Sequence, residues 1–463
     1  MFVMQSRWKI EKGRAIYYGL RNKEHLFQNE IKISERQKAI LLSLPKELGK
    51  REKDVLGKHL LGVVAVEEKD FRPVPKSLSD ARFCSSCAAN DFMIPGLEFD
   101  AEGRCPVCQC RKETEGLRSL VPVMNDFPHA KNSRFDVAVF YTGGKDSTYL
   151  LYYLSKVKGL RVLALTWEIP FMSKSAFLSI EGAKRSFPKV EFLSRRVNDE
   201  DLRKIYRKLY ELAENTCACP SLAYVLFYPE LVNLRVPYFV AGNEPAQILG
   251  LYFNHMAPKM AYRFASNKPL NFLINIGRVL TLHPPFKSGQ FQSLMTMKQL
   301  AYGDNPFKNL AGYRNDLVSN VVTALQEVPS LLAPLKRAIR SSSWSGHIPA
   351  FVQVDFDTIS GGHYDWHEVM GLLEKEAGYV LPPSAEKGLH TSCQIERCKE
   401  YSQFIRFYEM RSRMIPFSAL EMAIASSGRN LSREDAVREI EEELGFSLQE
   451  VKECALMKGY IEK

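Results

Sequence analysis

Long unbroken apolar runs are missing from this sequence of 463 residues. The stretch Leu270–Phe286, for example, is broken by asparagine, arginine and histidine, so we expect no membrane-spanning helix. The opening residues Met1–Lys9 lack the basic-then-apolar layout of a secretory signal peptide. Runs of about five or six like charges are absent too, which argues against a dedicated nucleic-acid arm. We therefore expect a cytoplasmic protein with no membrane partner.

The composition is that of an ordinary globular chain. Hydrophobic residues make up 45% of it, and a chain of this length holds about two to four domains. The formal net charge of +10 indicates an anionic partner, and ATP, a sugar nucleotide and RNA all qualify. Ten cysteines in a cytoplasmic chain indicate metal or sulfur chemistry before disulfides.

Two Cys-x2-Cys knuckles lie at roughly the interval of a zinc ribbon. The first holds Cys84 and Cys87, and the second holds Cys105 and Cys108. Four thiolates from two tight turns satisfy a tetrahedral zinc ion and leave no open position, so the predicted site is structural. A rubredoxin-like iron centre is the alternative. Because such a small segment buries little apolar surface, we expect metal binding to supply its folding energy.

Residues 137–150, Val-Ala-Val-Phe-Tyr-Thr-Gly-Gly-Lys-Asp-Ser-Thr-Tyr-Leu, are typical of a strand, a glycine turn and a helix. The glycine pair allows a tight turn, and the start of the helix favours an anion. A lysine adds positive charge, and an aspartate is placed to hold magnesium. The spacing of neither the Walker loop nor the dinucleotide-binding fingerprint is present. The predicted ATP contacts are Tyr141, Thr142, Gly143, Gly144, Lys145, Asp146, Ser147 and Thr148, of which Lys145 and Asp146 are also predicted to be catalytic.

From residue 135 onward apolar strands alternate with amphipathic helices. Strands are expected at 135–141, 161–167, 190–195 and 236–242, with helices near 146–158, 173–187 and 199–214. Such a pattern indicates an α/β fold with a parallel sheet covered by helices on both faces. Ligands of these sheets bind beyond the carboxyl ends of the strands, where Thr166, Trp167, Asn243 and Glu244 follow. We expect the first two near the nucleotide and the last two at substrate or magnesium. For Asn243 and Glu244, capping of the following helix is an equally good interpretation.

Three further cysteines are predicted to meet at the same edge of the sheet. Cys217 and Cys219 precede the helix that leads into the strand at 236, and Cys393 follows a proline break. Inert buried cysteines are the alternative interpretation. Residues 254–309 are rich in Lys, Arg, Met and aromatics and predict a helical insertion that covers the site. Residues 351–357 predict a further strand.

The glycine turn closely resembles the Ser-Gly-Gly-x-Asp-Ser loop of the PP-loop, or N-type ATP pyrophosphatase, superfamily, with Thr142 in place of the first serine. The resemblance implies a Rossmann-like fold of the adenine nucleotide α-hydrolase type. It also implies that ATP and Mg²⁺ bind at the loop, that a substrate oxygen attacks the α-phosphate, and that pyrophosphate is released.

Residues 94–105, Ile-Pro-Gly-Leu-Glu-Phe-Asp-Ala-Glu-Gly-Arg-Cys, narrow the resemblance. N-acetyl sugar amidotransferases of bacterial surface-polysaccharide synthesis are similar in having a paired-cysteine segment with Pro-Gly-x-x-Phe-Asp-x-x-Gly-x-Cys before a PP-loop domain. The stretch Asn430–Ala436 resembles their tail. This likeness implies a sugar or sugar-nucleotide substrate and ammonia from a partner glutaminase.

Two functions follow. In the first, nitrogen displaces AMP from the adenylated substrate, as the resemblance to the sugar amidotransferases implies. In the second, sulfur displaces it, as in PP-loop enzymes of tRNA thiolation. Cys217, Cys219 and Cys393 then hold a 4Fe-4S cluster, or Cys217 carries a persulfide. A sulfur-donor partner and tRNA belong to this alternative. A non-catalytic nucleotide-binding subunit is the third class.

The expected organisation has four parts. Residues 1–80 form a small N-terminal extension, and residues 81–115 form a zinc-ribbon-like metal segment. Residues 130–310 form the PP-loop ATP pyrophosphatase domain, and residues 311–463 form a mainly helical C-terminal region.

Overall fold

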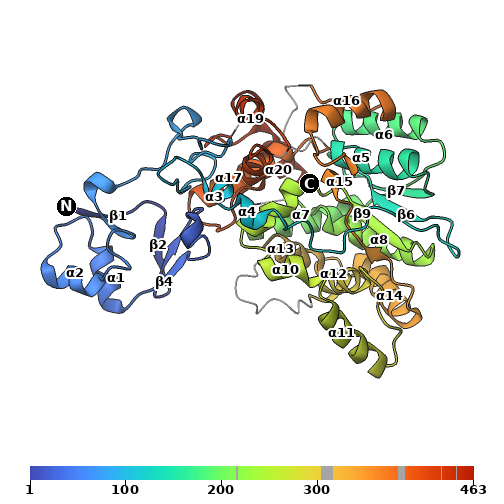
Figure 1. The fold of residues 1–463 in the computed structure, drawn as a ribbon, viewed down its shortest axis with the longest axis horizontal. Helices are drawn as coiled ribbons and strands as arrows, with labels where there is room; N and C mark the ends of the chain where they lie inside the picture. Colours follow the sequence, from blue (N-terminus) through green and yellow to red (C-terminus); the bar gives the residue numbers. More distant parts are fainter. Residues whose placement is uncertain (215–216, 304–315, 384–391, 429, 445) are drawn as a thin grey trace.

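The computed structural model describes residues 1–463 apart from residues 215–216, 304–315, 384–391, 429 and 445. A five-stranded parallel sheet lies at the centre of the larger part of the molecule (Figure 1). Its strands are β6 (Val137–Phe140), β7 (Val162–Trp167), β8 (Glu191–Arg195), β9 (Tyr238–Ala241) and β10 (Ala350–Phe351). Their order across the sheet is β10-β9-β6-β7-β8. This is the order of a doubly wound α/β sheet, in agreement with the predicted fold class.

Each strand contributes side chains to both faces of the sheet. In β6, Val137 and Val139 belong to one hydrophobic core, whereas Ala138 and Phe140 belong to another. All four residues are buried, because helices cover both faces. The absence of polar alternation in this strand therefore follows from two-sided burial.

Helices of the first face include α5 (Lys145–Tyr152), α6 (Lys174–Ser186), α9 (Pro245–Phe253), α16 (Trp366–Ala377) and α18 (Phe417–Ala425). Helices of the second face include α7 (Asp199–Ala213), α8 (Ser221–Asn233), α12 (Gln290–Tyr302), α13 (Asp316–Leu325), α14 (Pro329–Ser345) and α20 (Lys452–Glu462). Other helices after residue 100 are α3 (Pro106–Gln109), α4 (Arg111–Thr114), α10 (Lys259–Phe264), α11 (Lys268–Leu280), α15 (Phe356–Ile359), α17 (Glu396–Tyr408) and α19 (Arg433–Glu439). None of the described helices is long and apolar enough to cross a bilayer.

Two sequence-based expectations differ from the structure. The strand expected at 351–357 is the shorter β10, and α15 already begins at Phe356. The insertion expected to cover the site is helical, but α12 packs on α8, α14 and β10. It therefore extends the layer on one face of the sheet. Its neighbour α11 buries none of its residues.

The N-terminal 80 residues form a small unit with a core of their own (Figure 1, blue). It contains β1 (Phe2–Met4) paired with β5 (Ala65–Glu67), and the antiparallel sheet β2 (Trp8–Glu11), β3 (Arg14–Tyr17) and β4 (Glu30–Lys32). Helices α1 (Glu35–Leu42) and α2 (Lys50–Leu56) complete it. Arg7 joins this unit to α17 by donating to the carbonyls of Phe407 and Tyr408, each at 2.6 Å.

Candidate functional site

Glycine shapes the turn between β6 and α5. Gly143 has a φ of +75°, a conformation that residues with a Cβ rarely adopt. A Cβ at this position would lie 2.5 Å from the carbonyl oxygen of Ala176 in α6. Only glycine therefore permits both the turn and the close approach of α6.

Hydroxyl groups hold this loop in shape. Thr142 Oγ1 lies 3.2 Å from Ser147 Oγ and accepts a hydrogen bond from the amide of Gly144 at 3.3 Å. The hydroxyls of Ser147 and Thr148 donate to the carbonyl of Gly144 at 3.1 and 2.8 Å. No side chain caps the start of α5, so its first amides and the positive end of its dipole remain available to an anion. The loop is suited to phosphate.

The loop lies where the strand order of the sheet reverses. β6 and β9 are neighbours, and the turn after β9 approaches the start of α5 so closely that a Cβ at Gly242 would lie 2.8 Å from the amide nitrogen of Ser147. Doubly wound sheets bind their ligands in the crevice at this point. Asn243 and Glu244 follow Gly242, so the structure brings both of them beside the loop.

Lys145 is surrounded by groups from the C-terminal third of the chain. Its ammonium lies 4.8 Å from the ring centroids of both Tyr364 and Trp366, and it pairs with Asp146 at 2.5 Å. The hydroxyl of Tyr364 donates to Asp146 Oδ1 at 2.6 Å. Burial disfavours the Lys145 ammonium, but Asp146 and Glu244 outweigh this effect and raise the pKa of Lys145. A positive charge is therefore fixed at the start of α5.

Glu244 is completely buried beside this network. Trp366 Nε1 donates to its Oε2 at 3.0 Å, whereas its Oε1 has no hydrogen-bond partner among the described residues. Burial raises the pKa of Glu244 well above the usual glutamate range, and the charges of Glu421 and Asp146 add to the effect although Lys145 opposes it. Glu244 therefore holds its proton to higher pH than an ordinary glutamate does, and one of its oxygens is unused.

Three other predicted contacts have structural partners. Thr166 Oγ1 donates to the carbonyl of Tyr141 at 3.0 Å, and the Tyr141 hydroxyl donates to the carbonyl of Ser179 at 3.3 Å. Asn243 offers its carbonyl oxygen to Gln353 Nε2 at 2.7 Å. The side chains of Tyr141 and Thr166 are buried and join the ends of β6 and β7, so they hold the loop in place from behind. Trp167 is buried as well, and its Nε1 has no hydrogen-bond partner among the described residues.

Cys217, Cys219 and Cys393 all interact electrostatically with Tyr206 of α7. Burial raises the pKa of Tyr206, and the charges of all three cysteines raise it further. Burial likewise raises the pKa of each thiol, to about 12 for Cys393. Cys219 is nevertheless exposed to solvent. Cys393 thus interacts with two thiols that lie more than 170 positions earlier in the sequence.

Lys399 is a cation that interacts electrostatically with all three cysteines. It forms ion pairs with Glu396 and Glu400, both in α17. Burial disfavours its charge, but the two glutamates and Cys217 outweigh burial and raise the pKa of Lys399. In turn, Lys399 favours the thiolate forms, because it lowers the pKa of each cysteine against the effect of burial.

The start of α6 connects the cysteine group to the phosphate loop. Cys393 pairs with Met172 in an antiparallel bridge, and Gln394 donates its amide to the carbonyl of Phe171 at 2.7 Å. Four residues after Met172, Ala176 is the residue whose carbonyl lies against Gly143. Both groups therefore border the segment that follows β7, at the carboxyl edge of the sheet. His390, which precedes Cys393 in sequence, lies outside the described residues.

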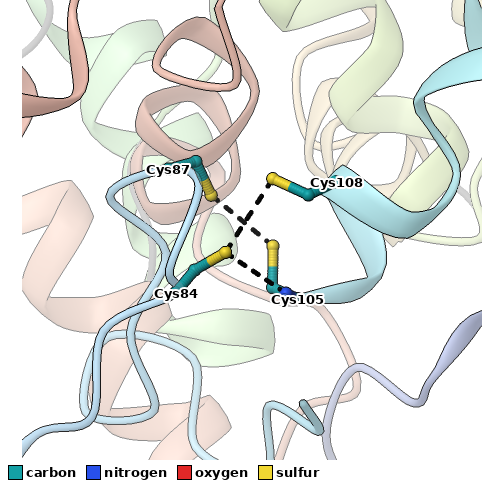
Figure 2. Close-up of side chains that lie close together, drawn as sticks. All are labelled: Cys84, Cys87, Cys105 and Cys108. Carbon is teal, nitrogen blue, oxygen red and sulfur yellow. Dashed lines mark hydrogen bonds between the residues drawn. The ribbon is translucent and has the colours of Figure 1, made fainter. Parts of the chain in front are cut away.

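Cys84, Cys87, Cys105 and Cys108 form a separate four-sulfur group (Figure 2). Their sulfur atoms all lie within 4.8 Å of one another, with 3.8 Å between Cys84 and Cys108 and 3.5 Å between Cys87 and Cys105. Tetrahedral zinc, with Zn–S bonds of about 2.3 Å, requires sulfur–sulfur edges of about 3.8 Å. Thiolates of a 4Fe-4S cluster bind four separate irons and are more widely spread. The geometry fits one tetrahedral metal ion. No other group of three or more potential ligand atoms in the described part of the chain is this compact.

This four-cysteine segment is not an isolated appendage. The amide of Ala88 donates to Ser426 Oγ at 2.9 Å, and Arg433 donates to the carbonyl of Cys84 at 3.1 Å. Three of the four cysteines belong to the same core as α5 and α18. Tertiary packing therefore contributes to the stability of this segment beside the expected metal binding.

Sequence reasoning missed Tyr364, Trp366 and Lys399. Asp365, which caps α16, did mark a helix start, but nothing near Trp366 in sequence connects it to a loop more than 200 residues earlier. The signal for Lys399 was equally weak, since a lysine flanked by glutamates on a helix is usually solvated.

Comparisons with known proteins identify no family for this chain. No family model matches the chain, and no curated protein matches it. Among solved structures, it is similar to the U34-tRNA thiolase NcsA from Methanococcus maripaludis with its 4Fe-4S cluster, at 16% sequence identity over 57% of this chain and 88% of that chain. The TM-score is 0.23, which is too low to establish a shared fold. The resemblance to N-acetyl sugar amidotransferases gains no support from these comparisons.

Proposed function

We propose that this chain is an ATP-dependent sulfurtransferase that adenylates an oxygen of its substrate and replaces that oxygen with sulfur. One observation carries the proposal: Cys393 pairs with Met172 just before α6, at the sheet edge where the phosphate loop lies, and Cys217 and Cys219 interact with it electrostatically. Nitrogen transfer needs no such cysteines, and we find no feature of the site that favours it over sulfur transfer.

The phosphate loop is the proposed site of the first step. The substrate oxygen attacks the α-phosphorus of ATP, the bond from this phosphorus to the bridging oxygen breaks, and pyrophosphate leaves with the electron pair. Lys145 and the first amides of α5 would stabilise the charge on pyrophosphate. Glu244, whose pKa burial raises, can exchange a proton with the substrate through its unused Oε1.

The cysteine group is the proposed site of the second step. Hydrosulfide from a sulfur-donor partner attacks the carbon that bears the adenylated oxygen, the carbon–oxygen bond breaks, and AMP leaves. Sulfur keeps its oxidation state, so no oxidant or reductant is consumed. Lys399 would draw the hydrosulfide anion toward the thiols and favour their deprotonated forms.

We propose that these three cysteines hold a 4Fe-4S cluster, with each thiolate bound to a separate iron. Metal binding would also offset the raised pKa of the three thiols, because a coordinated thiol is deprotonated. A cluster with three protein ligands supplies a fourth iron that is free to bind sulfide.

Anaerobic reconstitution with iron and sulfide tests the proposal. Wild-type protein should gain about four irons and acid-labile sulfide, with the broad visible absorption of a cluster. The variants Cys217→Ser, Cys219→Ser and Cys393→Ser should lose this iron, whereas Cys454→Ala, at a buried cysteine elsewhere, should keep it. The cluster proposal fails if wild-type protein binds metal only at the four-cysteine site, or if the three serine variants retain the iron.

Product analysis distinguishes the two chemistries. With the correct substrate, ATP should yield AMP and pyrophosphate, and hydrosulfide should support turnover where ammonia does not. Turnover with ammonia alone would establish the nitrogen reaction instead. Detection of ADP and phosphate would contradict adenylation altogether.

For the compact site of Cys84, Cys87, Cys105 and Cys108 we propose structural zinc. All four positions of a tetrahedral ion are filled by thiolates, so none remains for a substrate or water. Metal analysis of anaerobically purified protein should find about one zinc per chain. Adding or removing ATP should not change this zinc content. Iron at this site in freshly purified protein would support the rubredoxin-like alternative.

A further inference from the structure

Helix α11 (Lys268–Leu280) exposes the side that a surface helix normally buries. Five of its large apolar side chains are exposed, with Leu280 at 78%, Phe272 at 66% and Leu273 at 63%. At 100° per residue, Phe272, Leu273, Ile276, Val279 and Leu280 span an arc of about 120°. We call these five residues, together with Leu282, the α11 apolar face. Leu282 is 83% exposed.

The polar side of α11 faces the protein and is held there. Asn275 exchanges hydrogen bonds with the backbone of Phe286 at 2.8 and 3.2 Å. Arg278 stacks over the ring of Phe286 at 4.0 Å and donates to the carbonyl of Ser343 at 2.7 Å. The outward direction of the apolar face is therefore fixed by contacts on the opposite side of the helix. Figure 1 shows α11 at the periphery of the molecule, away from the sheet.

The stretch of chain that contains α11 is basic and has no acidic residue. Between Glu244 and Asp304 there is no aspartate or glutamate, although 53 of the 463 residues are acidic. The same stretch contains Lys259, Arg263, Lys268, Arg278, Lys287 and Lys298. Helix α14, which holds Arg278 through Ser343, also lacks acidic residues. Its Trp344 is 63% exposed and lies beside His283, with ring centroids 4.6 Å apart.

We propose that the α11 apolar face binds the surface of an anionic lipid bilayer. The helix would lie in the interface, with its aliphatic side chains in the acyl boundary and the basic residues among the lipid headgroups. Trp344 is at the rim, where tryptophan prefers to sit in membranes. A nucleic acid fits this face less well, because it is recognised by cations and stacking aromatics, whereas five of the six residues are aliphatic. The proposal is independent of the sulfur-transfer proposal and differs from the expectation of no membrane partner.

Vesicle flotation with the full-length protein tests this binding. Vesicles of phosphatidylcholine mixed with phosphatidylglycerol should bind the protein, vesicles of phosphatidylcholine alone should bind it much less, and salt should weaken the binding. The double variant Leu273→Gln/Leu280→Gln should bind at least about tenfold more weakly, because two large apolar side chains no longer enter the bilayer. Lys268→Glu should weaken binding to the anionic vesicles only.

Leu42→Gln in α1 is the matched control, since Leu42 is 61% exposed on the N-terminal unit. It should bind like the wild type. All substitutions are at exposed positions, and unchanged thermal melting would exclude misfolding. Absence of binding to anionic vesicles, or equal binding by the double variant, would overturn the proposal. So would light scattering that shows a dimer dissociated by the double variant, because the face would then join two copies of the chain.

Discussion

At the scale of single residues, the candidate site depends on the absence of a Cβ at Gly143 and on the burial of the Glu244 carboxyl group. One position has no room for a Cβ, and the other holds a carboxyl group out of water. Both features are set by neighbours that are distant in sequence, so each yields a prediction with a control elsewhere in the chain.

Substituting Gly143 by alanine should destabilise the fold and abolish ATP binding. The positive φ alone costs about 1–2 kcal/mol for alanine, and the new Cβ would force α6 away from the loop. Gly159→Ala is the matched control, because Gly159 has a φ of +66° with open space around it. Denaturant unfolding and ATP titration should show a larger loss for Gly143→Ala, and the close approach of α6 would be in doubt if the two variants behaved alike.

The stability of the protein should depend on pH through Glu244. Its raised pKa means that the folded protein keeps this proton to higher pH than the unfolded chain does. Stability is therefore lost as pH rises above the ordinary value of 4.5 toward the pKa in the folded protein. Glu244→Gln keeps an acceptor for Trp366 but does not titrate, so its stability relative to wild type should increase with pH, by at most about 1.4 kcal/mol per pH unit.

Thermal melting from about pH 4 to about pH 9 measures this effect, because the range begins near the ordinary pKa of a glutamate and extends well above it. Glu327→Gln, at an exposed position, should parallel the wild type throughout. Parallel curves for Glu244→Gln as well would show that Glu244 ionises normally.

At the scale of elements, the segment that holds the two cysteine knuckles contacts helices of the C-terminal region. Hydrogen bonds from Ala88 to Ser426 and from Arg433 to Cys84 connect the first knuckle to α18 and α19. Ordering of the knuckles by metal is thereby linked to packing of the helices beside the phosphate loop. The structural metal proposed for this position would therefore stabilise more than its own segment.

We expect Cys84→Ser to release one metal ion and to lower the thermal stability of the whole domain. The cost should be several kcal/mol, because the remaining thiols and the core around them lose a shared ligand. Cys110→Ala is the control: Cys110 is buried beside the second knuckle but is not one of the four clustered thiols. It should retain the metal and lose less stability. Retention of metal by Cys84→Ser would contradict the assignment of the four ligands.

At the scale of the whole molecule, the C-terminal third completes a site that begins near residue 140. Tyr364 and Trp366 enclose Lys145, Cys393 lies beside the start of α6, and β10 adds the fifth strand. We therefore expect the segment around the phosphate loop and the C-terminal third of the chain to unfold together. A nucleotide should stabilise both.

Mg-ATP should raise the melting temperature of the protein in a single transition. At a ligand concentration one hundred times the dissociation constant, binding contributes about 2.7 kcal/mol. Lys145→Ala should remove most of this shift, whereas Lys156→Ala, further along the same helical segment, should preserve it because Lys156 is exposed and pairs with Glu376. Two separate transitions, of which ATP shifts only one, would show that the C-terminal third folds independently of the loop.

The sequence alone determined the features that depend on neighbours along the chain. Strands at 162–167 and 191–195 and helices at 174–186 and 199–213 lie within about two residues of their expected bounds, because periodicity and turn residues report burial locally. The glycine pair specified the tight turn, and the spacing of the two knuckles specified a compact four-sulfur group.

Only the tertiary structure decided which distant groups meet. The strand order placed the turn after β9 beside Ser147, and packing of the C-terminal third placed Trp366 beside Glu244 and Lys399 among the three cysteines. Burial, which sets the pKa of Glu244 and of these thiols, depends on the atoms that surround a group on every side. A one-dimensional pattern cannot specify those atoms, because chain topology brings them from segments hundreds of residues apart.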